Sequence, residues 1–431
     1  MKKFFVSAGL AAIGVAGIQS ALAEPTSPKY WSVAATLRGF YDSNYNIQNN
    51  GQGSSGVEFL PSISLHVPLQ QTDVGIRFTY GLYYYQDRQD AGVDPFDMTY
   101  QADMWLQHAF NERWNLKVTD TFAVGQEPEL LNPNPTSANA TVLRANGNNI
   151  SNQGNIALNT DWTRLFSTTV TYNNGFYDYQ NTGATVDSSG NLTPSLAGTL
   201  NRIEQNAAID FKWHIQPETT ALFGYAFSWV CYTGNEPIAV VPITTPTFNG
   251  VYMSSDRDMR SQYLYLGIEQ QFTPNLNGMI RGGANYADVY ADPLFPSTSW
   301  SPYADISLSY TYRPGSYVQL GFTHDISSTD QVQPNSAGQI TQYMNSSVVY
   351  LDINHRFTPK LVGTAIGRVQ YSTYVGGAAS SSNQTDYGLG FNLAYQFNQF
   401  LSADVGYNYD NVVGINAFTR NRYYFGLSVS Y

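Results

Sequence analysis

The feature that most constrains the fold is a strict period of two in the hydropathy of the final segment. Every second residue there is apolar or aromatic, namely Tyr423, Phe425, Leu427, Val429 and Tyr431, and small or polar residues mostly fill the positions between them. Because successive side chains of a β-strand point to opposite sides, this segment predicts a strand with one apolar face and one polar face. Such a strand suits a boundary between an apolar medium and water.

The same alternation recurs along the chain and predicts many strands of similar length. It is clearest in the segments 31–38, 57–67, 74–82, 202–213, 386–397 and 401–410. Nearly all charged residues in these segments fall on the polar set of positions. Two packed soluble sheets would also hide one face, but their other faces would carry many more lysines and glutamates. The pattern therefore favours an all-β wall that is apolar outside and polar inside, as in a transmembrane β-barrel.

Short turns and long polar loops alternate between these segments, and together they predict the number of strands. Short turns are expected at 70–72, 111–113, 163–164, 214–218, 273–275, 313–315, 358–360 and 398–399. Longer loops are expected at 45–55, 86–97, 126–149, 178–199, 232–258, 288–299, 327–341, 375–384 and 411–420. Eight turns and nine loops join 18 strands of an antiparallel up-and-down barrel, with 16 strands as the alternative. An even number is typical of bacterial barrels, with short periplasmic turns and long external loops.

Composition fits this architecture and argues against other classes. Only 12% of the residues are charged, about half the usual share, while 15% are aromatic, with 33 tyrosines. The net charge of -11 argues against a nucleic-acid partner. Beyond the first residues no apolar run is long enough for a membrane-spanning helix. The single cysteine, Cys231, excludes an internal disulfide framework.

The start of the chain predicts export from the cytoplasm. Lys2 and Lys3 precede an uncharged apolar run at 4–18, and small residues at Ala21 and Ala23 frame a cleavage site. This pattern is typical of a secretory signal peptide. No cysteine follows the run, which argues against a lipid anchor. We expect a signal peptide at 1–23 and a single outer-membrane barrel at 24–431, surrounded by lipid and lipopolysaccharide.

The turns and the terminus also carry a family resemblance. The chain resembles the putative β-barrel porins of Gram-negative bacteria, some of which are encoded near exopolysaccharide genes. The resemblance rests on Gly-Phe-Tyr-Asp-Ser-Asn at 39–44, on Phe-Thr-Pro-x-Leu turns at 272–276 and 357–361, and on the aromatic terminus. It covers the mature chain and implies the fold but no substrate. The terminal set Phe425, Leu427, Val429 and Tyr431 is similar to the signal that barrel-assembly machinery recognises.

Charged residues at the polar positions are the candidates to line an aqueous lumen. They are Arg38, Arg77, Asp103, Lys117, Asp210, Glu269, Arg281, Asp305, Asp352, Arg356, Arg368 and Asp404, with Glu58, Lys212 and Asp386 in the same set. Opposed rows of acids and bases would orient a passing solute and set ion preference. The same charges could instead pair along the wall and brace it. A slight excess of inward acids predicts a modest preference for cations.

Other residue patterns argue against catalysis and leave two loops open. His324 and Ser327 are three residues apart, so they fall on opposite faces of a strand, unlike the His and Ser pair of barrel lipases. The acids Asp87, Asp90, Asp94 and Asp97 depart from the EF-hand spacing, so we expect no metal and no cofactor. Loop 126–149 could enter the pore or stay outside. The apolar loop 232–258 could cover the mouth or contact a partner.

These observations predict a porin-like passive channel for small hydrophilic solutes or ions, not an enzyme. A barrel of about 18 strands is wide enough for a water-filled lumen. The alternative is a non-conducting barrel with a structural or polysaccharide-export role at the cell surface. The sequence leaves the oligomeric state open.

Overall fold

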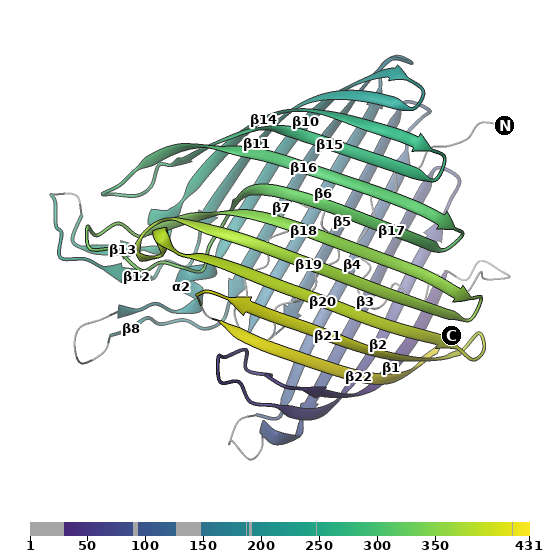
Figure 1. Cartoon of the computed structure of the whole chain (residues 1–431), viewed down its shortest axis with the longest axis horizontal. Coiled ribbons are helices and arrows are strands. Elements are labelled where there is room, and N and C mark those ends of the chain that lie inside the picture. Colours follow the sequence, from purple (N-terminus) through teal and green to yellow (C-terminus); the bar gives the residue numbers. More distant parts are fainter. Residues whose placement is uncertain are drawn as a thin grey trace.

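The computed structural model describes residues 30–88, 94–125, 148–186, 188, 192–246, 248–415 and 417–431. Its body is one antiparallel sheet of 18 strands, which wraps into a barrel with strongly tilted strands (Figure 1). The strands of the first half are β1 (Trp31–Asp42), β2 (Ser54–Pro68), β3 (Thr72–Tyr85), β4 (Phe96–Ala109), β5 (Trp114–Gly125), β6 (Asn149–Asp161), β7 (Phe166–Tyr179), β10 (Arg202–Gln216) and β11 (Thr219–Tyr232). Those of the second half are β14 (Met259–Thr273), β15 (Leu276–Val289), β16 (Ser297–Arg313), β17 (Ser316–Ser327), β18 (Thr341–Thr358), β19 (Leu361–Gly376), β20 (Asn383–Gln396), β21 (Leu401–Val413) and β22 (Phe418–Ser430).

Each barrel strand pairs with the next one along the chain, and the last pairs with the first. β22 lies antiparallel to β1, with Leu37 opposite Leu427 and Ala34 opposite Ser430. This pairing closes the sheet, so every barrel strand has two neighbours and no strand edge faces lipid. The predicted closed barrel of 18 strands is confirmed.

The two faces of the wall follow the predicted alternation. Large apolar side chains remain exposed on the outer face, for example Phe391, Leu393, Phe425 and Val429. Their sequence neighbours point inward and are mostly small or polar, as with Asn392, whose amide nitrogen donates to the Tyr424 hydroxyl and to Asp404. A wall that exposes so much apolar surface is suited to hydrocarbon rather than water.

The connections at the two ends differ as the sequence predicts. All eight short turns lie at one end, and several carry exposed aromatic residues, including Trp162, Phe357 and Phe397. Aromatic rings at that level form the girdle by which a barrel sits at a membrane interface. The described residues of the longer connections lie at the opposite end, toward the left of Figure 1.

The long loops at that end carry small elements of their own. These are the hairpins β8 (Thr185–Val186) with β9 (Leu192–Thr193) and β12 (Pro237–Val240) with β13 (Val251–Met253), the helix α2 (Leu196–Leu200) and the 3₁₀ turns η1 (Gln86–Arg88), η2 (Ser254–Arg257) and η3 (Ala378–Ser381). Among the described residues no helix is long and apolar enough to cross a membrane. The expected signal peptide and nearly all of loop 126–149 lie outside the described residues.

Loop 232–258 owes its apolar content to packing against other loops. Ile238, Phe248 and Tyr252 form a buried cluster with Val332 and Ile340 of the β17–β18 loop. The sequence left open what the apolar residues of this loop contact. In the structure they pack against neighbouring loops of the same chain. We call residues 233–258, 328–340 and α2 together the loop cap.

One buried arginine joins the three parts of the loop cap. Arg257 is fully buried, and its guanidinium donates to the carbonyl oxygens of Thr199 at 2.9 Å and Thr329 at 2.5 Å. Its guanidinium carbon lies 4.3 Å from the ring centre of Tyr232. The next residue, Asp258, accepts the Tyr232 amide at 2.7 Å, and burial raises the pKa of its carboxyl. The cap is thus a packed structure and not a set of separate loops.

Candidate functional site

The inner face of the barrel is the candidate site, and it has two unlike regions. The seam wall is the inner face of β20, β21, β22, β1 and β2, where the sheet closes. The amide wall is the inner face of β6, β7, β10 and β11. Most of the predicted charges lie on the seam wall or on the strands from β10 to β16.

Charged side chains on the seam wall form a continuous, buried network. Arg38 donates to Asp404 at 2.9 Å on one side and to Glu58 at 3.1 Å on the other. Arg422 donates to the second oxygen of Glu58 at 2.6 Å. All three partners Arg38, Glu58 and Asp404 are less than a tenth exposed. Two positive and two negative groups therefore neutralise one another along the closing strands.

A second pair secures the seam nearer to the long loops. The Arg420 guanidinium holds both carboxylate oxygens of Asp42, with Nε at 3.0 and 2.9 Å. Asp42 is entirely buried. A carboxylate in such a site is stable only with its partner, since an unpaired buried charge is very costly. This pair links the first barrel strand to the last.

A smaller charged cluster begins on β10 of the amide wall and extends to β15. Arg281 lies 3.3 Å from Asp210 and 3.7 Å from Glu269, and Lys212 lies 3.0 Å from Glu269. The Tyr265 hydroxyl donates to Asp210 at 2.6 Å. Asp305 is directly opposite Arg281 in the strand register. The four predicted residues Asp210, Glu269, Arg281 and Asp305 are therefore brought together.

Glycines on intervening strands let these charged groups lie flat against the wall. Gly426 stands between Arg38 and Asp404 in the register, and a Cβ there would come within 2.3 Å of Arg38 and 2.8 Å of Asp404. Gly224 stands in the same way beside Asp210, where a Cβ would lie 2.1 Å from the Tyr265 ring. A larger residue at either position would push the side chains away from the wall and into the lumen.

The other predicted lumen residues are more scattered. Asp352 accepts the Tyr317 hydroxyl at 3.1 Å, and Arg368 donates to Gln370 at 2.8 Å. Arg356 lies at the short-turn end, against Gly315. Lys117 lies opposite Gln107 in the register. These residues share the inner face without forming one site.

Arg77 and Asp103 are opposite one another in the register but are not paired. Asp103 instead accepts from Gln101 at 3.0 Å and from Thr121 at 3.1 Å. Arg77 makes no ion pair or hydrogen bond with any residue that the structure describes. The Arg77 guanidinium is therefore a candidate to contact a solute directly in the lumen.

Of the two interpretations of the inward charges, the geometry favours bracing. The ion pairs on the seam wall join adjacent or next-but-one strands, and Arg281 reaches Asp210 only three strands away. These contacts do not form opposed rows of acids and bases that face each other across the lumen.

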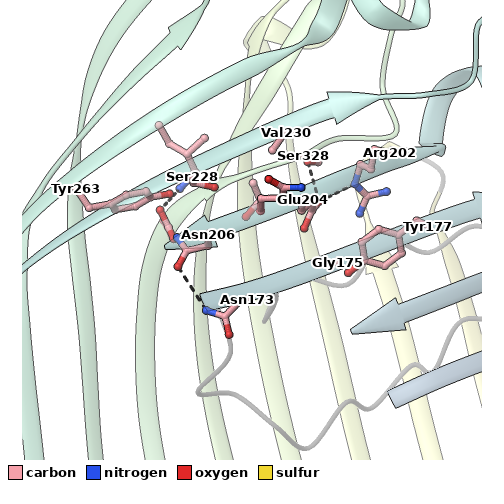
Figure 2. Close-up of a pocket in the computed structure, with 14 residues that line it drawn as sticks. Asn173, Gly175, Tyr177, Arg202, Glu204, Asn206, Ser228, Val230, Tyr263 and Ser328 are labelled. Atoms are coloured by element: carbon pink, nitrogen blue, oxygen red, sulfur yellow. Dashed lines mark hydrogen bonds and ion pairs between the residues drawn. The ribbon is translucent and has the colours of Figure 1, made fainter. Parts of the chain in front are cut away.

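The amide wall has a different chemistry, which the predicted set of charged residues does not include. Asn155 donates to Asn173 at 2.5 Å, and Asn173 donates to Asn206 at 3.4 Å, so amides run across three strands. Figure 2 shows Asn173 and Asn206 side by side beneath Ser228. The polar runs at 152–155 and 173–174 were the available signal, because Gln153, Asn155 and Asn173 fall there at inward positions of neighbouring strands.

A cavity opens between the amide wall and the loop cap, with an empty volume of about 660 Å³ that is partly open to solvent. At its edge Arg202 lies over the Tyr177 ring at 4.1 Å and pairs with Glu204 at 2.6 Å (Figure 2). Ser328 of the loop cap donates to Glu204 at 3.1 Å. The arginine at the edge of this cavity is thus neutralised locally.

The described acids of the loop near 87–97 each accept a hydrogen bond or form an ion pair. Asp97 pairs with Arg88 at 2.6 Å, Asp87 accepts the Ser55 amide and Asp94 accepts the Phe96 amide. Asp90 lies outside the described residues. Over the part of the chain that is described, no three His, Cys, Asp or Glu side chains are placed to hold a metal ion.

Comparison with known proteins supports the barrel porin resemblance. Residues 244–431 match the model of the family described as Putative beta-barrel porin 2. No curated protein matches the chain in sequence. The predicted resemblance to this family is confirmed over the matched residues, and the chain is a porin-like outer-membrane β-barrel.

Several solved structures share a distant likeness. OccK9 (OpdG) of Pseudomonas aeruginosa is 11% identical, with 93% of this chain and 98% of that chain covered and a TM-score of 0.41. The outer membrane protein OpdK of the same organism is 11% identical, with 93% and 99% covered and a TM-score of 0.43. The ferric enterobactin receptor PfeA of P. aeruginosa is 10% identical, with 93% and 80% covered and a TM-score of 0.45.

Proposed function

We propose that this barrel conducts small hydrophilic solutes and ions passively across the outer membrane. The observation that carries the proposal is the way its inward charges and rings lie against the wall. Arg38, Asp404 and Tyr265 cover glycines of neighbouring strands, so their side chains run along the sheet. A barrel of 18 strands has room for water at its centre when its side chains do so.

The amide wall suits uncharged or weakly charged solutes. Amide groups both donate and accept hydrogen bonds, so they can replace water around a passing solute without trapping an ion. The buried seam charges neutralise one another and offer little attraction to an ion in the lumen. We therefore expect weak ion selectivity, with at most a modest preference for cations.

Export and assembly follow from the ends of the sequence. We propose that residues 1–23 are removed after secretion and that the strand ending in Phe425, Leu427, Val429 and Tyr431 is recognised by barrel-assembly machinery. The outer face then contacts lipid and, at the long-loop end, lipopolysaccharide.

Single-channel recording in planar bilayers tests the proposal. Purified barrel should give steps of conductance that rise with salt concentration, and vesicles that contain it should swell in solutions of small neutral solutes. A correctly folded barrel that is silent in both assays would contradict the proposal and favour the non-conducting alternative.

A further inference from the structure

Over the described strands, the outer wall carries a polar patch with a carboxylate that does not fit a lipid-facing surface. It consists of Asp120 on β5, Asn152 and Gly154 on β6, and Asn174 on β7, which we call the outer polar patch. Asp120 shares its face with Phe122, which is 39% exposed, and lies opposite Met104, which is 43% exposed. Asp120 is directly opposite Gly154, and Gly154 is directly opposite Asn174. These register positions place the patch on the outside of the barrel.

The patch lies inside the apolar band and not at its rim. Asp120 is six residues above Trp114, which begins β5 at the short-turn end. At about 3.3 Å per residue and a tilt of about 40°, it stands about 15 Å above that girdle, within a band about 25 Å tall. Six residues above the start of other strands, the outward residues are Leu37 on β1 and Phe78 on β3. A carboxylate at this height is therefore exceptional on this wall.

Hydrocarbon chains cannot satisfy the polar groups of the patch. The Asn152 amide nitrogen donates to both oxygens of Asp120, at 3.0 Å each. A carboxylate can accept about four hydrogen bonds, so among the described residues most of the acceptor capacity of Asp120 has no donor. The Asn174 side chain makes no hydrogen bond with any other described residue. Ionisable and amide groups at membrane depth usually face protein or water instead.

We propose that the outer polar patch is an interface between copies of this chain in the membrane. Asn152 and Asn174 each present donors and an acceptor, and Asp120 presents acceptors, so the patch can satisfy the same patch on a second copy. Self-complementarity of this kind is what a symmetric homo-oligomer requires. Gly154 makes the surface flat beside Asp120, and small residues allow close approach between protein walls in a bilayer.

Cysteine cross-linking at matched glycines tests the proposal. In a Cys231→Ser background, Gly154→Cys places a thiol in the patch, where a Cβ would meet only the Asp120 carboxylate at 3.2 Å. Gly282→Cys is the control, because Gly282 lies on the outer face of β15 with nothing within 4 Å of a Cβ. Oxidation in outer-membrane vesicles should link Gly154→Cys copies into dimers and leave Gly282→Cys monomeric. Equal linking at both positions, or none at Gly154→Cys, would overturn the proposal.

A second pair of variants separates association from folding. Asp120→Leu with Asn152→Leu should shift the detergent-solubilised protein from a multiple of the chain mass to that of one chain, with its heat-modifiable gel mobility retained. Asn155→Leu lies on the inner face of the same strand β6 and should leave the mass unchanged. A wild-type barrel that is monomeric in both vesicles and detergent, or a double variant that stays oligomeric, would refute the interface.

Discussion

The seam wall and the amide wall face the same lumen, yet they hold the barrel together by different means. On the seam wall Arg38, Glu58 and Asp404 are paired and almost wholly buried. On the amide wall Asn155, Asn173 and Asn206 are partly exposed and joined by weaker neutral hydrogen bonds. The difference teaches that two regions of one inner face are held together by unlike chemistry. Buried ion pairs join the strands where the sheet closes, whereas partly exposed amides line β6, β7 and β10.

The seam should fail completely when its last strand is shortened. Deleting residues 425–431 leaves β1 and β21 with unpaired backbone groups, which cost several kcal/mol each in lipid. We expect the truncated protein to be degraded or to accumulate in the periplasm. Fractionation and heat-modifiable gel mobility would show this, and normal barrels in the outer-membrane fraction would contradict the closure.

Removing one seam charge should cost far more than removing an amide. Arg420→Ala leaves the fully buried Asp42 without its partner, and we expect a loss of about 3–5 kcal/mol in the free energy of unfolding. Asn206→Ala on the amide wall removes one long neutral hydrogen bond and should cost about 1 kcal/mol or less. Urea unfolding in detergent micelles measures both. Equal losses would erase the distinction between the walls.

A charge introduced on the outer face of β20 should destabilise the barrel more than the same charge introduced at the next, inward-facing residue. Leu393→Arg places a cation in the apolar band and should destabilise the barrel by about 2–4 kcal/mol. Asn392→Arg, the next residue, points into the lumen beside Asp404 and should cost much less. The same unfolding experiment compares them, and equal damage would show that the faces are wrongly assigned.

The smallest effect concerns ion preference. Asp305→Asn combined with Asp352→Asn removes two inward acids, and we expect a small shift of the reversal potential toward zero selectivity in dilute salt. Asn173→Ala with Asn206→Ala should leave the reversal potential unchanged, since the amide wall carries no net charge at those positions. A pore that prefers anions in dilute salt, or equal shifts from both double variants, would contradict this division.

Sequence periodicity predicted the strands and their faces, but not which inward residues meet. Parity assigns Arg38 and Asp404 to the inner face, because each lies on the polar set of its strand. Their contact depends on the register of β1, β22 and β21, and no local pattern gives the register between strands so far apart in sequence. The pair of Asp42 with Arg420 was missed for the same reason. The amide wall was missed because uncharged polar residues occur throughout the chain, so Asn173 and Asn206 did not stand out.

The pairing of β1 with β22 has a consequence for how the barrel folds. Thr36 and Ser428, which share a hydrogen bond across the closure, are 392 residues apart in the chain. Contacts between such distant residues form late and slowly, because the entropy of a very large loop must be lost first. Until β22 arrives, one edge of β1 is an open template for pairing with other chains. The rate of barrel formation is therefore governed by its final contact, and changes at the seam should alter the folding time more than equal changes elsewhere.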